Sequence, residues 1–288
     1  MTVRTGVIYD RDWAPEGLPG FAREAEELGV DDLWVVEDLG WNGGISAAAM
    51  ALGATRRLRV GIGIMPAPLR SPALLAMELA TLTRTYPGRL VAGIGHGVPE
   101  WMAMAGVSAR SPLALLEETI VSVRALLRGE RVDLRGREVQ LDGVRLVHPP
   151  AEPPLVVAGV VRPRSLELSV RVADGTLIAE GHGPRDVAHV RALARERGKA
   201  GHDVTVFAFC GVGDDTEKVA HRLSPVTEAQ GTWLGRPAAS VFTVSGGVAQ
   251  AADDVRQLAS AGADTVVLRV IGPEPLRQLA GVLGALND

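Results

Sequence analysis

The sequence alternates short runs of apolar, mostly β-branched residues with longer segments of helical periodicity, and this alternation restricts its fold more than any other feature. Parallel strands joined by crossover helices give this pattern. We predict eight strands, at Val3–Tyr9, Asp32–Glu37, Leu58–Met65, Leu90–Gly95, Leu155–Gly159, Gly175–Ala179, Val204–Gly211 and Thr265–Ile271. With 288 residues and 47% apolar side chains, the chain is predicted to form one α/β domain over residues 1–288, a (β/α)8 (TIM) barrel.

The predicted helices begin and end at recognisable signals. Ser71-Pro72 and Ser111-Pro112 each place an N-capping residue before a proline at the first helical position. Gly29 and Gly262 each follow a helical segment and precede a strand, as C-terminal glycines do. These glycines therefore mark the return of the chain to the N-terminal end of the barrel.

Three segments depart from the alternation. Residues 131–147 alternate apolar and polar positions around Gly136 and Gly143 and predict a small hairpin insertion before the fifth strand. Residues 148–154 hold four prolines and predict an extended connector. Residues 224–245 are rich in Gly, Pro and Thr, and we expect either a mobile covering loop or a surface crossover there.

Composition and charge argue against several classes of binding partner and of cellular location. A net charge of −4 without a basic run argues against nucleic acid or an anionic membrane surface. The single cysteine, Cys210, suits a reducing compartment and is expected to be an inert buried thiol. Residues 1–20 lack the apolar stretch of a signal peptide, and no later window resembles a membrane helix. We therefore expect a cytoplasmic protein with a small-molecule substrate.

The reactive groups of such barrels lie at the C-terminal ends of the strands. Neither lysine, Lys199 or Lys218, falls at a predicted strand end, so Schiff-base chemistry is disfavoured. The six histidines are dispersed without a chelating pair, so the sequence predicts no metal site. Paired carboxylates are available for glycoside hydrolysis, but 4% aromatic residues provide few sugar platforms. Three common chemistries of such barrels are therefore disfavoured.

The segment from Leu58 to Trp101 narrows this choice. It contains the strand RVGIGIMP, the Ser71-Pro72 helix start, and then YPGRLVAGIGHG, in which glycines alternate at the end of the fourth strand. This order resembles the luciferase-like monooxygenases and the deazaflavin-dependent oxidoreductases related to them. Residues 28–38, 154–178 and 245–268 are similar to the same family. The resemblance implies an oxidoreductase that uses coenzyme F420 or FMN.

We predict that a flat tricyclic ring rests on small residues of the third and fourth strands, because glycine permits close approach of the backbone. The resemblance implies a bulge, sometimes with a non-proline cis peptide, at the third strand. Helix N-termini after the fifth and sixth strands are expected to bind the cofactor phosphate. The predicted cofactor-binding residues are Ile62, Gly63, Ile64, Gly95, His96, Gly97, Gly159, Val160, Arg162, Glu180 and Gly181.

Asp38, His96 and Glu100 are the predicted catalytic residues, since each follows a strand or lies on the loop after it. Many deazaflavin-dependent relatives carry Asp-His where this chain has Asp38-Leu39, so one acid/base group of that branch is missing. Tyr9, Trp41 and Trp101 are predicted to contact the substrate.

Several functions stay open on the sequence. The first is hydride transfer between coenzyme F420 and a small organic substrate, which an arginine-rich composition typical of GC-rich bacteria slightly favours. The second is an FMN-dependent monooxygenase that uses reduced flavin and oxygen. A flavin-binding barrel without catalysis and a cofactor-free hydrolase are further alternatives. The family resemblance also implies a homodimer and allows a partner flavin or F420 reductase.

Overall fold

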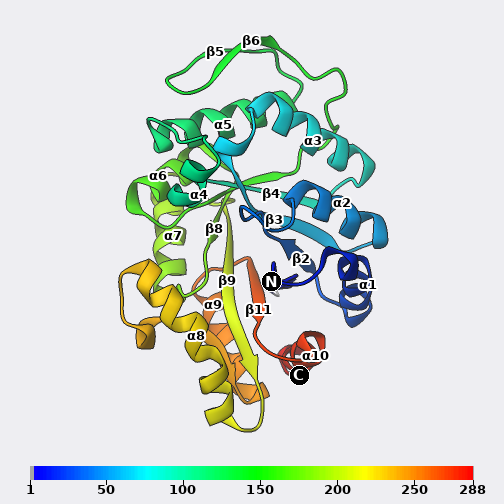
Figure 1. The fold of residues 1–288 in the computed structure, drawn as a ribbon, viewed down its shortest axis with the longest axis vertical. Coiled ribbons are helices and arrows are strands. Elements are labelled where there is room, and N and C mark those ends of the chain that lie inside the picture. Colours follow the sequence, from blue (N-terminus) through cyan, green and yellow to red (C-terminus); the bar gives the residue numbers. More distant parts are fainter. Residues whose placement is uncertain (1–2, 288) are drawn as a thin grey trace.

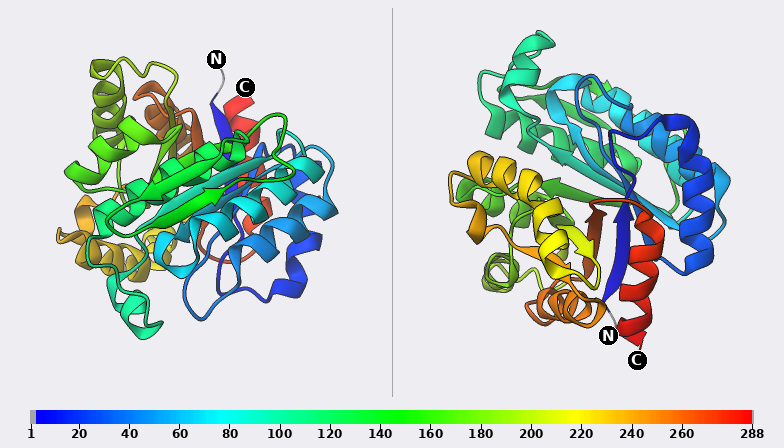
Figure 2. Two further views of the ribbon diagram at one scale, coloured as in Figure 1. Left: turned by 90° about the horizontal axis from the view of Figure 1, so that it is seen from above. Right: turned by 60° about the horizontal axis from the view of Figure 1, so that its bottom comes forward.

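The computed structural model describes residues 3–287, and eight parallel strands within them close into a barrel (Figure 1). The strands pair in the order β9-β11-β1-β2-β3-β4-β7-β8, and β8 pairs again with β9. They are β1 (Arg4–Ile8), β2 (Asp32–Val35), β3 (Arg59–Pro66), β4 (Leu90–Gly95), β7 (Leu155–Gly159), β8 (Gly175–Ile178), β9 (Asp203–Val212) and β11 (Thr265–Val270). All eight predicted strands are confirmed, with ends within two residues of those observed. The closing pair, β1 and β11, lies side by side in Figure 2.

Helices cover the outside of the barrel. They are α1 (Leu18–Leu28), α2 (Gly44–Ala54), α3 (Pro72–Thr85), α4 (Pro99–Met104), α5 (Pro112–Leu127), α6 (Pro163–Val172), α7 (Pro184–Glu196), α8 (Thr216–Leu234), α9 (Val248–Ser260) and α10 (Pro275–Asn287). Short 3-10 turns occupy η1 (Pro15–Gly17), η2 (Ala67–Leu69) and η3 (Ala238–Ser240). Every helix in this part of the chain is too short or too polar to span a lipid bilayer.

The helix signals were read correctly with one exception. Ser71 caps α3 by accepting the N–H of Leu74, and Gly29 ends α1 in the left-handed conformation. Ser111 precedes α5 as predicted, but its side chain caps nothing. Its backbone N–H instead donates to the carboxylate of Glu138 at 2.7 Å, which fastens the start of α5 to the hairpin.

The barrel interior is filled by side chains that alternate along the strands with outward-facing ones. An inner cluster packs along the axis and consists of Ile8, Trp34, Val91, Val157, Leu177, Phe207 and Val267, with Val36 and Ile64 beside it. The outward residues pack under the helices in a larger cluster. Full burial of such a side chain stabilises the fold by about 1.5–3 kcal/mol.

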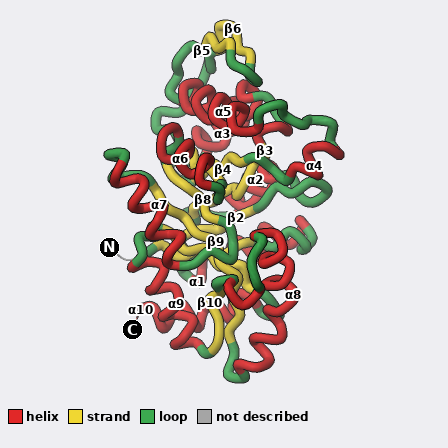
Figure 3. The backbone as a smooth tube through the Cα atoms, turned by 90° about the vertical axis from the view of Figure 1, so that its left-hand side faces the viewer, coloured by secondary structure: helices red, strands yellow, loops and turns green. Residues whose placement is uncertain are grey.

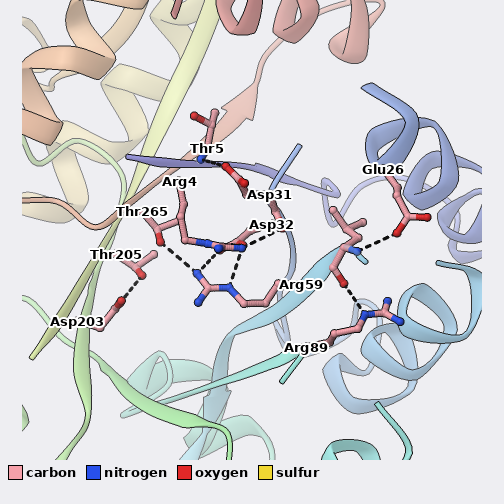
Figure 4. A network of polar contacts seen from close by, with 11 residues as sticks. Arg4, Thr5, Glu26, Asp31, Asp32, Arg59, Arg89, Asp203, Thr205 and Thr265 are labelled. Carbon is pink, nitrogen blue, oxygen red and sulfur yellow. Dashed lines mark hydrogen bonds and ion pairs between the residues drawn. The ribbon is translucent and has the colours of Figure 1, made fainter. Parts of the chain in front are cut away.

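Polar residues replace this apolar packing at the N-terminal end of the barrel, which we call the base (Figure 4). Asp32 is buried there and accepts hydrogen bonds from Arg4 at 2.8 Å and from Arg59 at 2.6 Å. Arg59 also donates to the hydroxyl of Thr265 at 3.2 Å. The starts of strands β1, β2, β3 and β11 are thereby joined by one ionic network.

The hairpin predicted over residues 131–147 is confirmed as β5 (Val132–Arg135) and β6 (Gln140–Val144), which pair antiparallel beyond α5 (Figure 3). The loop predicted over residues 224–245 is wrong in its first half, because the residues up to Leu234 belong to α8. Val219, Leu223 and Val226 on that helix pack against Phe209, which compensates for Pro225 inside it. Lys218 accordingly lies in the first turn of α8, away from any strand end, as the sequence predicted.

The end of that segment adds a further strand to the sheet. Strand β10 (Thr243–Gly246) pairs with the second half of β9, while β8 pairs with the first half. An antiparallel bridge joins Gly181 to Phe242. The chain after β8 is therefore held against the segment that precedes β10.

Candidate active site

Charged side chains gather at the C-terminal end of the barrel, which we call the mouth. Arg269 near the end of β11 donates from Nε to Oδ2 of Asp10, beyond the end of β1, at 2.8 Å. A second bond joins Nη2 to the other carboxylate oxygen at 3.3 Å. Burial raises the pKa of Asp10, but the hydrogen bond and charge of Arg269, the backbone N–H of Asp12 and the charge of Arg11 together outweigh it, and the pKa lies below its ordinary value. Asp10 is thus a fixed anion.

Glu180, just beyond β8, is less well compensated. Its Oε1 lies 3.9 Å from Nη1 of Arg269, too far for a hydrogen bond, and its side chain is 17% exposed. Burial raises its pKa, Arg269 and its own backbone amide oppose the shift, and the charges of Asp38 and Asp10 add to it. The backbone carbonyl of Glu180 accepts from Gln230 of α8 at 2.7 Å, which holds this segment in place. A carboxyl group with a raised pKa can serve as an acid at neutral pH.

Asp38 lies beyond the end of β2 and pairs with Arg11, whose Nη1 is 2.5 Å from Oδ2. The Arg11 guanidinium also lies over the ring of Trp41, 4.5 Å from its centroid. The indole Nε1 of Trp41 donates to Asp12 at 2.9 Å. The loops after β1 and β2 are therefore joined across the edge of the mouth, and Arg11 is a member of this group that the sequence analysis missed.

The two predicted substrate-contacting tryptophans lie together. The ring centroids of Trp41 and Trp101 are 5.9 Å apart at an angle of 43°, and Trp41 is 43% exposed. Glu100 is exposed in the first turn of the short helix α4, next to Trp101. The rings form an aromatic wall between the loops after β2 and β4, and their contact with substrate stays a prediction, as does catalysis by Glu100.

His96 follows β4 and turns toward α6. Its Nε2 lies 3.0 Å from the hydroxyl of Ser165, and its buried Nδ1 forms no hydrogen bond with any described residue. Burial lowers the pKa of His96, and the backbone of Pro112 opposes the shift only in part. The imidazole is therefore neutral at neutral pH and ties β4 to the start of α6; its predicted roles in catalysis and ring contact are untested by this geometry.

The predicted floor of glycines needs correction. A Cβ on Gly61 would come within 2.3 Å of the Trp34 ring, and one on Gly63 within 2.6 Å of Phe207. These glycines therefore make room for inner-core side chains and leave no open slot for a ring. Ile62 belongs to the outer cluster. The predicted irregularity is present, because the register shifts between Ile62 and Met65 and the Gly63–Ile64 peptide is cis.

Ile64 covers the remaining floor positions. A Cβ on Gly159 would lie 2.2 Å from its side chain, and one on Gly95 would lie 2.9 Å from it. Gly97 has a φ of +71° and packs against Met102 and Pro66. Any ring bound at the mouth would therefore meet the side chain of Ile64 before it met Gly95 or Gly159.

Of the two predicted phosphate-binding helix starts, one is open. Arg162 and Arg164 are exposed at the start of α6, and the backbone N–H groups of Arg164 and Ser165 form no hydrogen bond within residues 3–287. Val160 is not available, because its N–H donates to the carbonyl of Leu177 at 3.2 Å. The start of α6 thus combines two cations with free donors.

The start of α7 already holds a carboxylate. Gly183, its N-cap, donates its backbone N–H to Asp186 of the first turn at 2.9 Å. The carbonyl of Gly181 accepts from Phe242 and from Arg236. The expectation that Glu180 and Gly181 line a second phosphate pocket is therefore not favoured by the charges present.

Tyr9 packs away from the mouth, so the geometry does not favour its predicted contact with substrate. Its hydroxyl donates to the carbonyl of Ala14 at 2.6 Å, and its ring packs edge-on against Trp13 and Phe21. It belongs to the outer cluster, since residues that alternate with the inward-facing Ile8 point under the helices.

Two other strand-end groups have structural partners. Glu37 is buried, accepts two bonds from Arg70 and caps α2 through the N–H of Gly44. Cys210 is buried, and burial raises the pKa of its thiol to about 12, which confirms the expected inert thiol. No group of three or more metal-ligating side chains gathers among residues 3–287.

Comparison with known proteins identifies a family and individual relatives with similar sequences. Residues 8–282 match the family described as luciferase-like monooxygenase. The chain is 28% identical over 193 residues to a 5,10-methylenetetrahydromethanopterin reductase of Methanolobus tindarius, which aligns 66% of this chain and 59% of that one. It is 31% identical over 186 residues to an F420-dependent glucose-6-phosphate dehydrogenase of Nakamurella multipartita, covering 60% of this chain and 54% of that protein. The matches therefore span little more than half of these relatives.

The fold has counterparts among solved structures. An F420-dependent secondary alcohol dehydrogenase in complex with an F420-acetone adduct superimposes with a TM-score of 0.87. The two chains are covered completely, at 18% sequence identity. This likeness concerns the barrel and its connections.

Proposed function

This chain belongs to the luciferase-like monooxygenase family, and we propose that it transfers a hydride between coenzyme F420 and a small organic substrate at the barrel mouth. The observation that carries the proposal is the open start of α6 beside a mouth of partly buried acids. An anionic cofactor tail needs backbone donors and nearby cations, and this helix start provides both. The dependence of the Nakamurella relative on F420 favours the deazaflavin over FMN.

Each part of the mouth would have a separate task. Arg162, Arg164 and the free N–H groups of α6 would bind the cofactor phosphate. Trp41 and Trp101 would limit the access of water to the substrate. The bound deazaflavin would supply the hydride chemistry, and the protein would position the reactants and handle protons. The fixed Asp10–Arg269 pair would keep the local charge constant during the reaction.

The proposal is tested by titrating purified protein with F420 and with FMN while ring fluorescence is recorded. We expect saturable quenching by F420 at lower concentration than by FMN. The double variant Arg162→Gln, Arg164→Gln should bind at least about tenfold more weakly, a loss of about 1.4 kcal/mol. Arg137→Gln on the exposed hairpin is the matched control and should bind like the wild type.

Three outcomes distinguish the alternatives. Preferential binding of FMN would replace the proposal with a flavin-dependent monooxygenase. Binding of neither cofactor would overturn it. If F420 binds, oxidation of reduced F420 by acetone and by other small carbonyl compounds would identify the substrate class, since the cofactor's absorbance reports each hydride transferred.

A further inference from the structure

Glu180 is the mouth carboxyl group that no partner neutralises. Asp10 accepts two hydrogen bonds from Arg269, and Asp38 pairs with Arg11 at 2.5 Å. Glu180 has only the long 3.9 Å approach of Arg269, and no other described residue donates a hydrogen bond to its side chain. Two of the three acids at this site therefore have a guanidinium within hydrogen-bond distance, and the third does not.

Glu180 is surrounded by residues of β11, of the ends of β1 and β2, and of α8. Arg269 of β11 is the nearby cation, and the anions Asp10 and Asp38 approach from the ends of β1 and β2. Gln230 of α8 holds its backbone carbonyl, and Arg236 beyond that helix holds the carbonyl of the next residue. Burial and two anions against one cation favour the neutral acid.

Its position is as important as its charge. Arg269 of β11 lies 3.9 Å from Oε1 of Glu180 and donates to Asp10 beyond β1 at 2.8 Å, so this carboxyl group from β8 reaches toward the ends of β11 and β1. In the barrel order β9 separates β8 from β11, so the carboxyl group reaches past a neighbouring strand and lies at the mouth. Its side chain is still 17% exposed, so a proton taken up from solvent can reach it.

The other candidates are less suited to exchange a proton. Asp10 has a lowered pKa and a fixed partner, and His96 has a lowered pKa and turns toward Ser165. Glu100 is exposed on the outer helix α4.

We propose that Glu180 is the catalytic acid/base that exchanges a proton with the substrate during hydride transfer. As a hydride supplied by the bound cofactor reached a carbonyl carbon, the Glu180 carboxyl would give its proton to the carbonyl oxygen, so that an alcohol and a carboxylate would result. In the reverse direction the carboxylate takes the hydroxyl proton as the hydride leaves the carbon. The inference rests on the proposed function, because that function supplies the hydride.

The first test needs no cofactor. Infrared difference spectra of wild type minus Glu180→Gln are recorded across a pH series, and the protonated-carboxyl band is followed. We expect Glu180 to be protonated at neutral pH in the free protein. A band already lost in mildly acidic solution would mean an ordinary ionised glutamate and would overturn the inference, whether or not F420 binds.

The second test separates binding from chemistry. Glu180→Gln should bind F420 like the wild type, while hydride transfer with acetone or 2-propanol falls by about 10²–10⁴-fold. Glu180→Asp should recover part of the rate and shift its pH profile. Glu152→Gln, an exposed glutamate before β7, is the matched control. Equal rates in Glu180→Gln and wild type would refute the role of Glu180, whereas a wild type that does not bind F420 would refute the proposed function.

Discussion

Both ends of the barrel carry buried charges, but the partners that neutralise these charges are complete at one end and incomplete at the other. At the base, Asp32 is 1% exposed on its side chain and receives hydrogen bonds from Arg4 and Arg59 on both oxygens. At the mouth, Glu180 keeps only a long contact with Arg269 and its pKa is raised. A fully satisfied network fixes the ends of strands, whereas an incompletely satisfied acid can change its charge. The comparison assigns stability to the base and chemistry to the mouth.

The largest expected stability effect follows from breaking the base. Asp32→Ala leaves Arg4 and Arg59 without their shared partner, and we expect the free energy of unfolding to fall by about 3–5 kcal/mol. Urea unfolding of the cofactor-free protein measures this. Asp253→Ala, which removes an exposed pair with Arg256, should cost less than about 1 kcal/mol. Equal losses in the two variants would contradict the difference between buried and exposed pairs.

The middle of the barrel should respond to added volume. Gly61→Ala places a methyl group against the Trp34 ring, and we expect a loss of about 1–3 kcal/mol or more. Gly284→Ala in α10 meets nothing within 4 Å and should be neutral or stabilising by up to about 1 kcal/mol. Thermal unfolding compares them. A tolerated Gly61→Ala would reopen the possibility that this glycine faces an open slot.

The stability of the protein should depend on pH through Glu180 at the mouth. The pKa of Glu180 is raised in the folded protein above its ordinary value of 4.5. At pH values between the unfolded and folded pKa, the folded state therefore binds more protons than the unfolded state. The stabilisation is complete below the unfolded pKa and is lost as pH rises through the folded pKa. Wild type should therefore lose stability relative to Glu180→Gln over that interval, as measured by urea unfolding. Parallel pH curves for the two proteins would show that Glu180 titrates normally.

The aromatic wall should give the smallest change. Trp41 and Trp101 are in contact near the surface, and we expect a coupling of about 0.5–1.5 kcal/mol in a double-mutant cycle with leucine at both positions. Chemical denaturation of the four proteins measures it. Additive losses would mean that the rings pack independently.

Strand and helix positions could be predicted because each depends on local pattern. Gly29 ends α1 as predicted, and Leu90–Gly95 is a strand with the predicted bounds. The segment after Ser224 was mistaken for a loop because Pro225 outweighed the apolar spacing that packs α8 on Phe209. That packing joins residues distant in the sequence, so local pattern did not reveal it.

The sequence indicated which residues lie at the strand ends better than it indicated the partners with which they interact. The rule that strand ends carry function selected Asp38 and Glu180, which lie at the mouth, but it also selected Tyr9, because period-two alternation was not applied to decide which residue of β1 points inward. The Asp10–Arg269 pair could have been found, since closure of eight strands makes β1 and β11 neighbours. The covering of Gly61 by Trp34 and of Gly159 by Ile64 required three-dimensional packing.

The most direct test of the mouth as a cofactor site is the thermal unfolding midpoint of the wild-type protein with increasing F420, measured beside an FMN series. A ligand at about 100 times its dissociation constant stabilises the native state by about 2.7 kcal/mol. We predict a saturable rise in the midpoint with F420 that exceeds the rise with FMN. A midpoint that neither cofactor moves would contradict the assignment of chemistry to this end of the barrel.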